Sequence, residues 1–271
     1  MKEALPQLAL SPGPWLVIAP HMDDESLGCG MLLAERDAAQ PVHVIFASDG
    51  SRSPPLPAGD RALEGLVGTR QTEARKALSE LGVPADAVEF LDFPDGALSD
   101  YSAPLQSALD TRIRELQPAH VFVPFRYDRH PDHLAVNRAV TERRSERRIQ
   151  AEVWEYFVYS QWRLLPTGDV RTYLCQEDLF STFSEAAAAR KRRALNCHRS
   201  QTTMLSPAQQ RPILTAALIE RICSEPEALL RQRTDLPGRK ALERSRWWIP
   251  IAHRLEPALK RLKDRLVTTT S

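Results

Sequence analysis

The chain has 271 residues, of which 42% are hydrophobic and 26% charged, and its formal net charge at pH 7 is +1. This length and composition suit a globular protein with one α/β domain and a small appendage. The sequence contains no apolar run of about eighteen residues, so it predicts no membrane-spanning helix. Residues 1–13 lack the apolar core of a signal peptide, and we therefore expect a cytoplasmic protein.

The cysteines argue against two kinds of scaffold. All four lie far apart in the sequence, and none forms a Cys-x-x-Cys pair. Neither a disulfide framework nor a cysteine-based zinc site is therefore expected. The four are Cys29, Cys175, Cys197 and Cys223.

Apolar strand patterns alternate with helix patterns along the first 160 residues. We expect strands at 15–19, 42–47, 88–91, 120–124 and 153–159, and helices at 28–39, 61–81, 102–116 and 134–148. This alternation predicts an α/β fold with a Rossmann-like, mostly parallel sheet that has helices on both faces. Beyond residue 160 the pattern weakens, and we expect helices at 185–198 and 207–223, followed by a helical C-terminal extension.

A first polar motif follows the strand expected at 15–19. His21, Asp23, Asp24 and Glu25 place four ionisable groups where the carboxyl end of a parallel strand would bind a ligand. Zinc hydrolases use three ligands from these residue types and leave a position for water, and a nearby carboxylate can act as base. Alternatively, the acidic residues cap the helix that follows.

A second motif, His130-Pro131-Asp132-His133, follows the strand expected at 120–124. One histidine can bind a metal while the other lies near the substrate as an acid, and the aspartate can orient an imidazole. Alternatively, the segment is a solvated polar loop in which Asp132 caps a helix. Because both motifs occupy equivalent strand ends, a shared metal site explains them better than separate caps do.

Together the two motifs resemble the PIG-L/LmbE-like family of zinc-dependent N-deacetylases. That family includes N-acetylglucosaminyl-phosphatidylinositol deacetylase and the deacetylases of mycothiol and bacillithiol synthesis. Its first motif is similar to residues 19–25 here, and its second is complete at residues 130–133. Weaker matches occur at residues 70–74, 93–96 and 191–201. The first motif departs from the family at Met22, where proline is usual, but proline supplies no ligand and we expect the site to form.

The resemblance implies a hydrolase that removes an N-acyl group, expected to be acetyl, from an amino sugar or sugar conjugate. It implies a deacetylase domain at 14–205, preceded by an N-terminal extension at 1–13 and followed by a helical, basic extension at 206–271. The cofactor implied is Zn²⁺, although Fe²⁺ also suits two histidines and a carboxylate. The metal ligands implied are His21, Asp24 and His133.

The same resemblance assigns roles to the remaining polar residues. Asp23 becomes the general base, and His130 becomes the acid that protonates the leaving amine or steadies the oxyanion. Asp132 would orient a histidine, and Arg70 would reach toward a sugar hydroxyl or an anionic aglycone. Asp49 and Asp95 are further substrate-contact candidates, although either could equally be a turn aspartate.

The end of the chain is basic. Residues 231–266 contain eleven Lys or Arg and four Asp or Glu, and residues 247–266 predict an amphipathic helix. Such a helix can lie on an anionic membrane, which would place the protein peripherally at its inner face. Alternatively, it packs on the domain with a solvated basic face. Nothing before residue 247 resembles an aromatic nucleic-acid groove, so we expect no nucleic acid partner, and the sequence does not determine the oligomeric state.

Three other functional classes fit parts of this pattern. A metal-dependent amidase or deacetylase could act on a non-sugar or lipid-linked substrate with the same residues. A metallo-phosphoesterase shares the metal chemistry, but such sites usually recruit two metals and more ligands. A nonenzymatic Rossmann-type binding module leaves the two His/Asp clusters unexplained, and the sequence has no Gly-x-Gly-x-x-Gly nucleotide loop.

Overall fold

The computed structural model describes residues 5–56, 60–145, 149–158 and 170–232. Its centre is a seven-stranded sheet in the order β3-β2-β1-β4-β5-β7-β6. β1 to β5 run parallel, β7 runs antiparallel to both of its neighbours, and the sheet is therefore mostly parallel. The strands are β1 (Trp15–Ala19), β2 (Val42–Ser48), β3 (Val88–Phe93), β4 (His120–Pro124), β5 (Glu152–Tyr156), β6 (Leu179–Thr182) and β7 (Glu227–Arg231).

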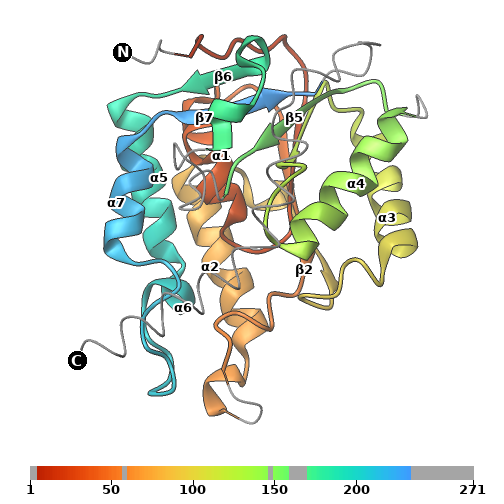
Figure 1. Ribbon diagram of the computed structural model, residues 1–271. Coiled ribbons are helices and arrows are strands. Elements are labelled where there is room, and N and C mark those ends of the chain that lie inside the picture. The colour runs from red at the N-terminus through yellow and green to blue at the C-terminus, as the bar shows by residue number, and fades with distance from the viewer. Residues whose placement is uncertain (1–4, 57–59, 146–148, 159–169, 233–271) are drawn as a thin grey trace.

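Helices cover both faces of the sheet (Figure 1). On one face lie α1 (Asp24–Glu35), α2 (Leu66–Glu80), α5 (Glu185–Cys197) and α7 (Ala216–Ser224), and on the other lie α3 (Ser102–Leu116) and α4 (Pro131–Ser145). A four-residue helix, α6 (Arg199–Thr202), follows α5. Short 3₁₀ turns occur at Arg61–Leu63, Ala85–Ala87, Val170–Tyr173 and Gln176–Asp178.

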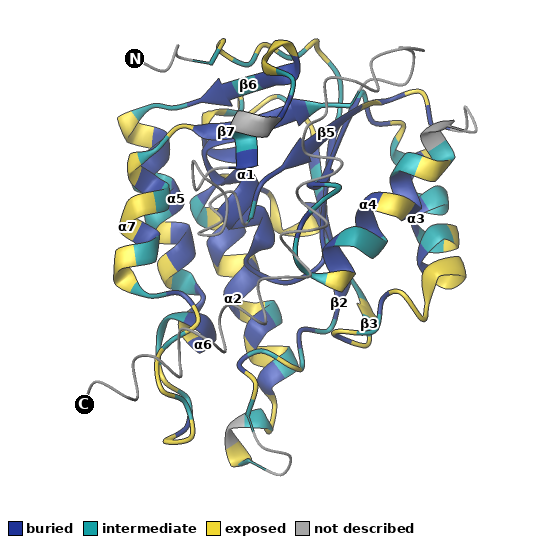
Figure 2. Cartoon of the chain, viewed as in Figure 1, coloured by how far each residue is buried: buried dark blue, intermediate teal, exposed yellow. Residues whose placement is uncertain are grey.

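The alternation of side chains along β1 builds a core on each side of the sheet. Val17 and Ala19 belong to the cluster that packs under α1, α2 and α5, whereas Leu16 and Ile18 belong to the cluster under α3 and α4. All four are fully buried, as expected for a parallel strand covered on both faces. Figure 2 shows the sheet buried and the outer sides of the helices exposed.

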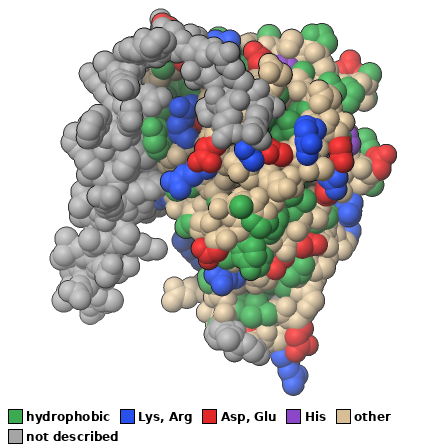
Figure 3. Space-filling model, turned by 90° about the vertical axis from the view of Figure 1, so that its right-hand side faces the viewer, with side chains coloured by type: hydrophobic (Ala, Val, Ile, Leu, Met, Phe, Trp, Pro, Cys, Tyr) green, Lys and Arg blue, Asp and Glu red, His purple; other side chains and the backbone are tan. Residues whose placement is uncertain are grey.

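The outer side of the α3/α4 layer carries charges of both signs. Figure 3 shows acidic and basic side chains interspersed with apolar ones over this face. Arg112 on α3 pairs with Glu89 and Glu115, and Arg143 on α4 pairs with Asp110. These two helices are therefore packed on the sheet by one side and solvated on the other.

The predicted fold class is confirmed, with corrections to individual elements. α1 begins at Asp24 and α4 at Pro131, so each polar motif runs into the first turn of its helix. The helix expected at 61–81 begins at Leu66, after a 3₁₀ turn. Of the helix expected at 207–223, only α7 forms, because Pro212 interrupts the pattern and Thr215 caps a new helix start.

Two strands, β6 and β7, were not predicted, because their apolar runs, Leu179-Phe180 and Ala228-Leu229-Leu230, are shorter than the run that marks β1. β7 lies inside the sheet, between β5 and β6, although it follows the boundary predicted at residue 205. The N-terminal segment also reaches the sheet, since Leu8 donates a backbone hydrogen bond to Ser181 of β6. The division into 1–13, 14–205 and 206–271 stays a prediction.

The basic segment at 247–266 lies outside the described residues. Among the helices that the structure does describe, none has both the length and the apolar character that crossing a membrane requires.

Gly28 offers a test of how tightly α1 packs on the sheet. A Cβ at this position would overlap the ring of Tyr156, which is fully buried and donates a hydrogen bond to the carbonyl of Ile18. Because this ring has no room to move, Gly28→Ala should lower the free energy of unfolding by about 1–3 kcal/mol. Urea denaturation followed by circular dichroism measures the change.

Gly68 on α2 is the matched control, because a Cβ placed there meets nothing within 4 Å apart from its chain neighbours and the backbone of its own helix. Gly68→Ala should raise stability by about 0.5–1 kcal/mol through helix propensity alone. Equal effects of the two substitutions would contradict the packing described.

Candidate functional site

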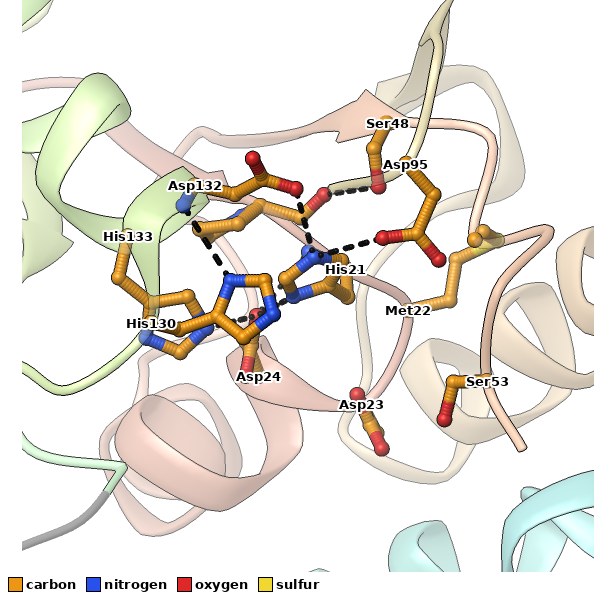
Figure 4. A network of polar contacts seen from close by, with 12 residues as sticks. His21, Met22, Asp23, Asp24, Ser48, Ser53, Asp95, His130, Asp132 and His133 are labelled. Carbon is orange, nitrogen blue, oxygen red and sulfur yellow. Dashed lines mark hydrogen bonds and ion pairs between the residues drawn. The ribbon is translucent and has the colours of Figure 1, made fainter. Parts of the chain in front are cut away.

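The two polar motifs meet at the carboxyl edge of the sheet. β1 and β4 are parallel neighbours, so the segments that follow them emerge side by side. The Asp24 carboxylate lies between two imidazoles, with Oδ2 3.1 Å from His21 Nδ1 and 3.2 Å from His133 Nε2. It also accepts the backbone N–H of His21 at 3.0 Å, which fixes the turn between β1 and α1. Figure 4 shows this convergence.

Each of these imidazoles is also held at its other ring nitrogen. His21 Nε2 lies 3.1 Å from Asp132 Oδ2 and 3.2 Å from Asp95 Oδ1. His133 Nδ1 lies 3.1 Å from Asp128 Oδ1. Histidines that ligate metals typically present one nitrogen to the metal while a carboxylate holds the other. Both histidines have that arrangement around Asp24.

Burial and charge act in opposite directions on these groups. Burial lowers the pKa of His133, but the charges of Asp24 and Asp128 outweigh it and raise that pKa to about 10. Burial likewise lowers the pKa of His21, but hydrogen bonds to Asp132, Asp24 and Asp95 raise it well above the ordinary value. Burial raises the pKa of Asp24, yet the charge of His133 leaves it far below its usual range. Carboxylates thus concentrate positive charge here, and a divalent cation could replace the imidazole protons.

The donor set fits a metal ion. Two imidazoles and one carboxylate are ligands that zinc hydrolases use. Among the described residues, two groups bring three ligand atoms within 4.8 Å of one another, namely His21/His130/His133 and His21/Asp95/Asp132, and neither contains Asp24. The predicted set shares His21 with both groups and His133 with the first. The predicted ligands His21, Asp24 and His133 stay a prediction that this geometry supports.

Asp23 occupies the N-cap position of α1 without capping it. Its φ of 145° is unusual for a residue with a side chain, and its carboxylate accepts no hydrogen bond from the described first turn of α1. Burial raises the pKa of Asp23 to about 6, although the charge of Arg70 opposes the rise. The Arg70 guanidinium lies close by, with Nη2 3.6 Å from Asp23 Oδ1. The helix-capping interpretation of Asp23 is therefore wrong, and its carboxylate faces the cavity described below.

Arg70 anchors the loops around Asp23. Its side chain is 1% exposed, and it donates hydrogen bonds to the carbonyls of Gly50 at 2.8 Å and Met22 at 2.9 Å. This contact fixes the loop at Met22, the position at which the family usually has proline. Arg70 lines the cavity, but its predicted contact with a sugar or anionic aglycone stays a prediction.

The two other substrate-contact candidates differ in their surroundings. Asp49 Oδ1 accepts the backbone N–H groups of Ser51 at 2.9 Å and Asp95 at 3.2 Å, as a turn aspartate does. Asp95 contacts His21, and although burial raises its pKa, the hydrogen bond and charge of His21 lower that pKa to about 2. Asp95 lines the cavity, whereas Asp49 is not among the described lining residues.

His130 lines the cavity, and one of its ring nitrogens accepts a backbone hydrogen bond. Its Nδ1 accepts the backbone N–H of Asp132 at 3.2 Å, so the neutral ring carries its proton on Nε2. Burial and the positive charges of His21 and His133 lower the pKa of His130 and favour this neutral form. The ring lies edge-on to His21, with centroids 4.6 Å apart. His130 can therefore donate a hydrogen bond from Nε2.

The Asp132 carboxylate contacts His21 of the first motif and not the adjacent His130 of its own motif. Its carboxylate contacts His21 and accepts the N–H groups of Gly96 at 2.7 Å and Leu98 at 3.0 Å. Only its backbone N–H reaches His130. The solvated-loop interpretation of Asp132 is wrong, because the residue is fully buried.

Asp128 is a site residue that the sequence did not reveal. It is 2% exposed, its Oδ1 accepts the backbone N–H of His130 at 3.1 Å, and the same oxygen lies 3.1 Å from His133 Nδ1. Its position two residues before a histidine motif was the only signal available.

A cavity of about 570 Å³ opens over these groups. Polar side chains form one part of its wall and aliphatic side chains form another. Its polar side chains include His21, Asp23, Asp24, Asp95 and His130. The predicted acid, base and metal ligands thus lie at one cavity, with His133 directly behind Asp24.

Comparison with known families agrees with this arrangement. Residues 16–143 match the PIG-L family, described as GlcNAc-PI de-N-acetylase. The chain carries a PIG-L domain. Both motifs lie within the matched residues, and the resemblance inferred from them is confirmed.

Solved structures share the fold of the PIG-L domain. N,N'-diacetylchitobiose deacetylase from Pyrococcus horikoshii is 18% identical, with 84% of this chain and 88% of that chain covered and a TM-score of 0.62. A zinc-inhibited form of teicoplanin deacetylase is 19% identical, covering 82% and 100%, with a TM-score of 0.55. The 4-carboxy-2-hydroxymuconate hydratase GalB from Pseudomonas putida is 18% identical, covering 84% and 99%, also at 0.55. Because a hydratase shares this fold, the fold alone does not determine the reaction.

From the contact between Asp128 and His133 we predict that the affinity for zinc depends on the Asp128 carboxylate. Asp128→Asn should weaken zinc binding about 10- to 100-fold, because His133 loses the carboxylate that orients its ring. Competition with a chromophoric chelator measures the affinity. Asp86→Asn, at an exposed position on a 3₁₀ turn, is the control and should change nothing. Equal affinity of both variants would show that Asp128 does not support a metal ligand.

Proposed function

We propose that the protein is a metal-dependent hydrolase that removes an N-acyl group, most simply acetyl, from an amino sugar or sugar conjugate. The observation that carries this proposal is the Asp24 carboxylate placed between two imidazoles, each held from behind by a carboxylate. The PIG-L match and the deacetylase activities named for two proteins of the same fold support an amide substrate.

The proposed metal ligands are His21, Asp24 and His133. A zinc ion held there would act as a Lewis acid toward the amide carbonyl and would make water more acidic. Fe²⁺ suits the same ligands, and the teicoplanin deacetylase structure is described as inhibited by zinc. The experiment below therefore measures which of the two metals the protein binds.

Asp23 and His130 supply the proton chemistry in this proposal. Asp23 accepts a proton as water attacks the amide carbon. Its carboxylate supports that role because it makes no capping hydrogen bond to α1. His130 donates a hydrogen bond from Nε2 to the developing oxyanion, because its Nδ1 is already occupied by a backbone N–H. The carbon–nitrogen bond then breaks, the proton passes to nitrogen, and a carboxylate and a free amine leave. Asp132 positions His21 through its carboxylate and His130 through its backbone.

The proposal separates the roles of Asp23 and His133. Asp23→Ala should retain the metal and lose about 10²- to 10⁴-fold in turnover, the usual contribution of a general base. His133→Ala should lose the metal itself. The measurements are metal content, for zinc and iron, and amine release from a panel of N-acetylated sugars.

Several outcomes would contradict the proposal. An Asp23→Ala variant that keeps most of its activity removes the base assignment. No amine release from any of the N-acetylated sugars by metal-loaded protein would contradict the deacetylase and leave the reaction of the hydratase with this fold as the one to test. Two metals per chain would favour a phosphoesterase, whereas one per chain supports the deacetylase.

The substrate class includes a lipid-linked alternative. A lipid-linked or non-sugar amide would use the same catalytic residues, and residues 247–266 could then contact the membrane peripherally. Sedimentation with anionic vesicles, before and after truncation at residue 240, tests this part of the proposal. Unchanged sedimentation would remove the membrane contact.

A further inference from the structure

The cavity has an aliphatic wall that the catalytic chemistry does not use. Its side chains come from α1, from the end of β5, from the segment before α7 and from α7 itself. They are Leu27, Val158, Ile213, Leu214, Leu218 and Ile222, which we call the apolar wall. We infer that the apolar wall binds an aliphatic or other apolar group attached to the substrate next to the scissile amide. This inference rests on the proposed function and names a substrate class for it.

α7 shows that the wall is more than the inner face of a packed helix. Ile219 and Cys223 are buried and pack with Leu195 and Leu214 in the core beneath α7. Leu218 and Ile222 pack against the edge of this cluster, but they are only half-buried and line the cavity. They are four residues apart and so lie on one side of the helix. α7 thus presents one apolar stripe to the core and an adjacent one to the cavity.

The wall begins at the catalytic groups. Leu27 follows Asp23 by four residues, donates its backbone N–H to the Asp23 carbonyl at 2.8 Å, and belongs to the same apolar cluster as the α7 residues. One helical turn rises only about 5.4 Å, so the wall starts within one turn of the proposed base. An amide held at Asp23 therefore has its substituent against aliphatic side chains.

The size and openness of the cavity fit such a substituent. Its volume of about 570 Å³ is within the range of roughly 300–1,000 Å³ that drug-sized ligands occupy. Ile213 remains 39% exposed in the wall, so apolar surface is available for a ligand to cover. Arg52, Arg221 and Glu225 also line the cavity, and a substrate with polar and apolar parts suits this combination.

Two substrate series distinguish which side of the amide carries the apolar group. In the first, N-acetylglucosamine is a methyl, butyl or hexyl glycoside. In the second, the methyl glycoside of glucosamine carries an acetyl, butanoyl or hexanoyl group on nitrogen. We expect kcat/KM for amine release to rise in one series by roughly three- to fourfold for each methylene that becomes buried.

Substitutions in the apolar wall test whether it causes the rise in kcat/KM with chain length. The double variant Leu218→Ser/Ile222→Ser should reduce the hexyl-to-methyl ratio of kcat/KM, or the equivalent acyl ratio, toward one. Ile213→Ser, at a partly exposed position, should lower the same ratio with less effect on folding. Met204→Ser is the control, because Met204 is 51% exposed and is not among the described lining residues. It should leave the ratio unchanged.

The results separate this inference from the proposed function. If the short-chain substrates are hydrolysed but the long-to-short ratio of kcat/KM is near one in both series, the inference is overturned and the proposed function stands. The same holds if kcat/KM rises with chain length and all wall variants keep that rise. If no substrate releases an amine, the proposed function fails. In that case, the affinities of hexyl and methyl β-D-glucosides, measured by calorimetry, test whether the apolar wall binds an alkyl group. Tighter hexyl binding that Leu218→Ser/Ile222→Ser abolishes would support it, and equal binding would overturn it.

Discussion

The site depends on one buried carboxylate that two histidines share. Asp24 is 3% exposed, and its Oδ2 is within 3.2 Å of ring nitrogens on His21 and His133. A carboxylate so removed from water is stable only with charge-assisted partners, and the neighbouring acids keep both imidazoles available as those partners. The same geometry, with each ring held from behind, is what a tightly bound cation requires. Charge balance thus links the two motifs and gives the cavity its chemistry.

The helix that carries Asp24 is held by a second buried ion pair. Lys191 on α5 and Glu227 on β7 are 2.7 Å apart, and Lys191 also donates to the carbonyl of Leu27. Glu227 accepts the backbone N–H groups of Met31 and Leu32. The pair therefore binds backbone groups in the middle of α1 and connects that helix to the far part of the sheet. Removing either partner would leave a buried charge and free backbone groups, which is costly.

The first part of the fold was predictable because its signals are local. The buried run at Trp15–Ala19 alternates between two cores, and the strand positions up to β5 follow from such runs. The starts of α1 and α4 were predicted four and three residues late, because the acidic pair and His-Pro-Asp-His were interpreted as loops. Both segments enter helices at once, where their side chains still point into the site.

Local sequence determined the candidate residues: it shows the two motifs, their place at the ends of β1 and β4, and their resemblance to the PIG-L family. Tertiary structure alone decided which partner each side chain meets. Asp132 contacts His21, more than a hundred residues away, rather than the adjacent His130. Asp128 becomes buried beside His133, and α7 supplies part of the apolar wall of the cavity. Hydrogen-bond partners and cavity walls depend on segments distant in the chain, whose approach no local periodicity encodes.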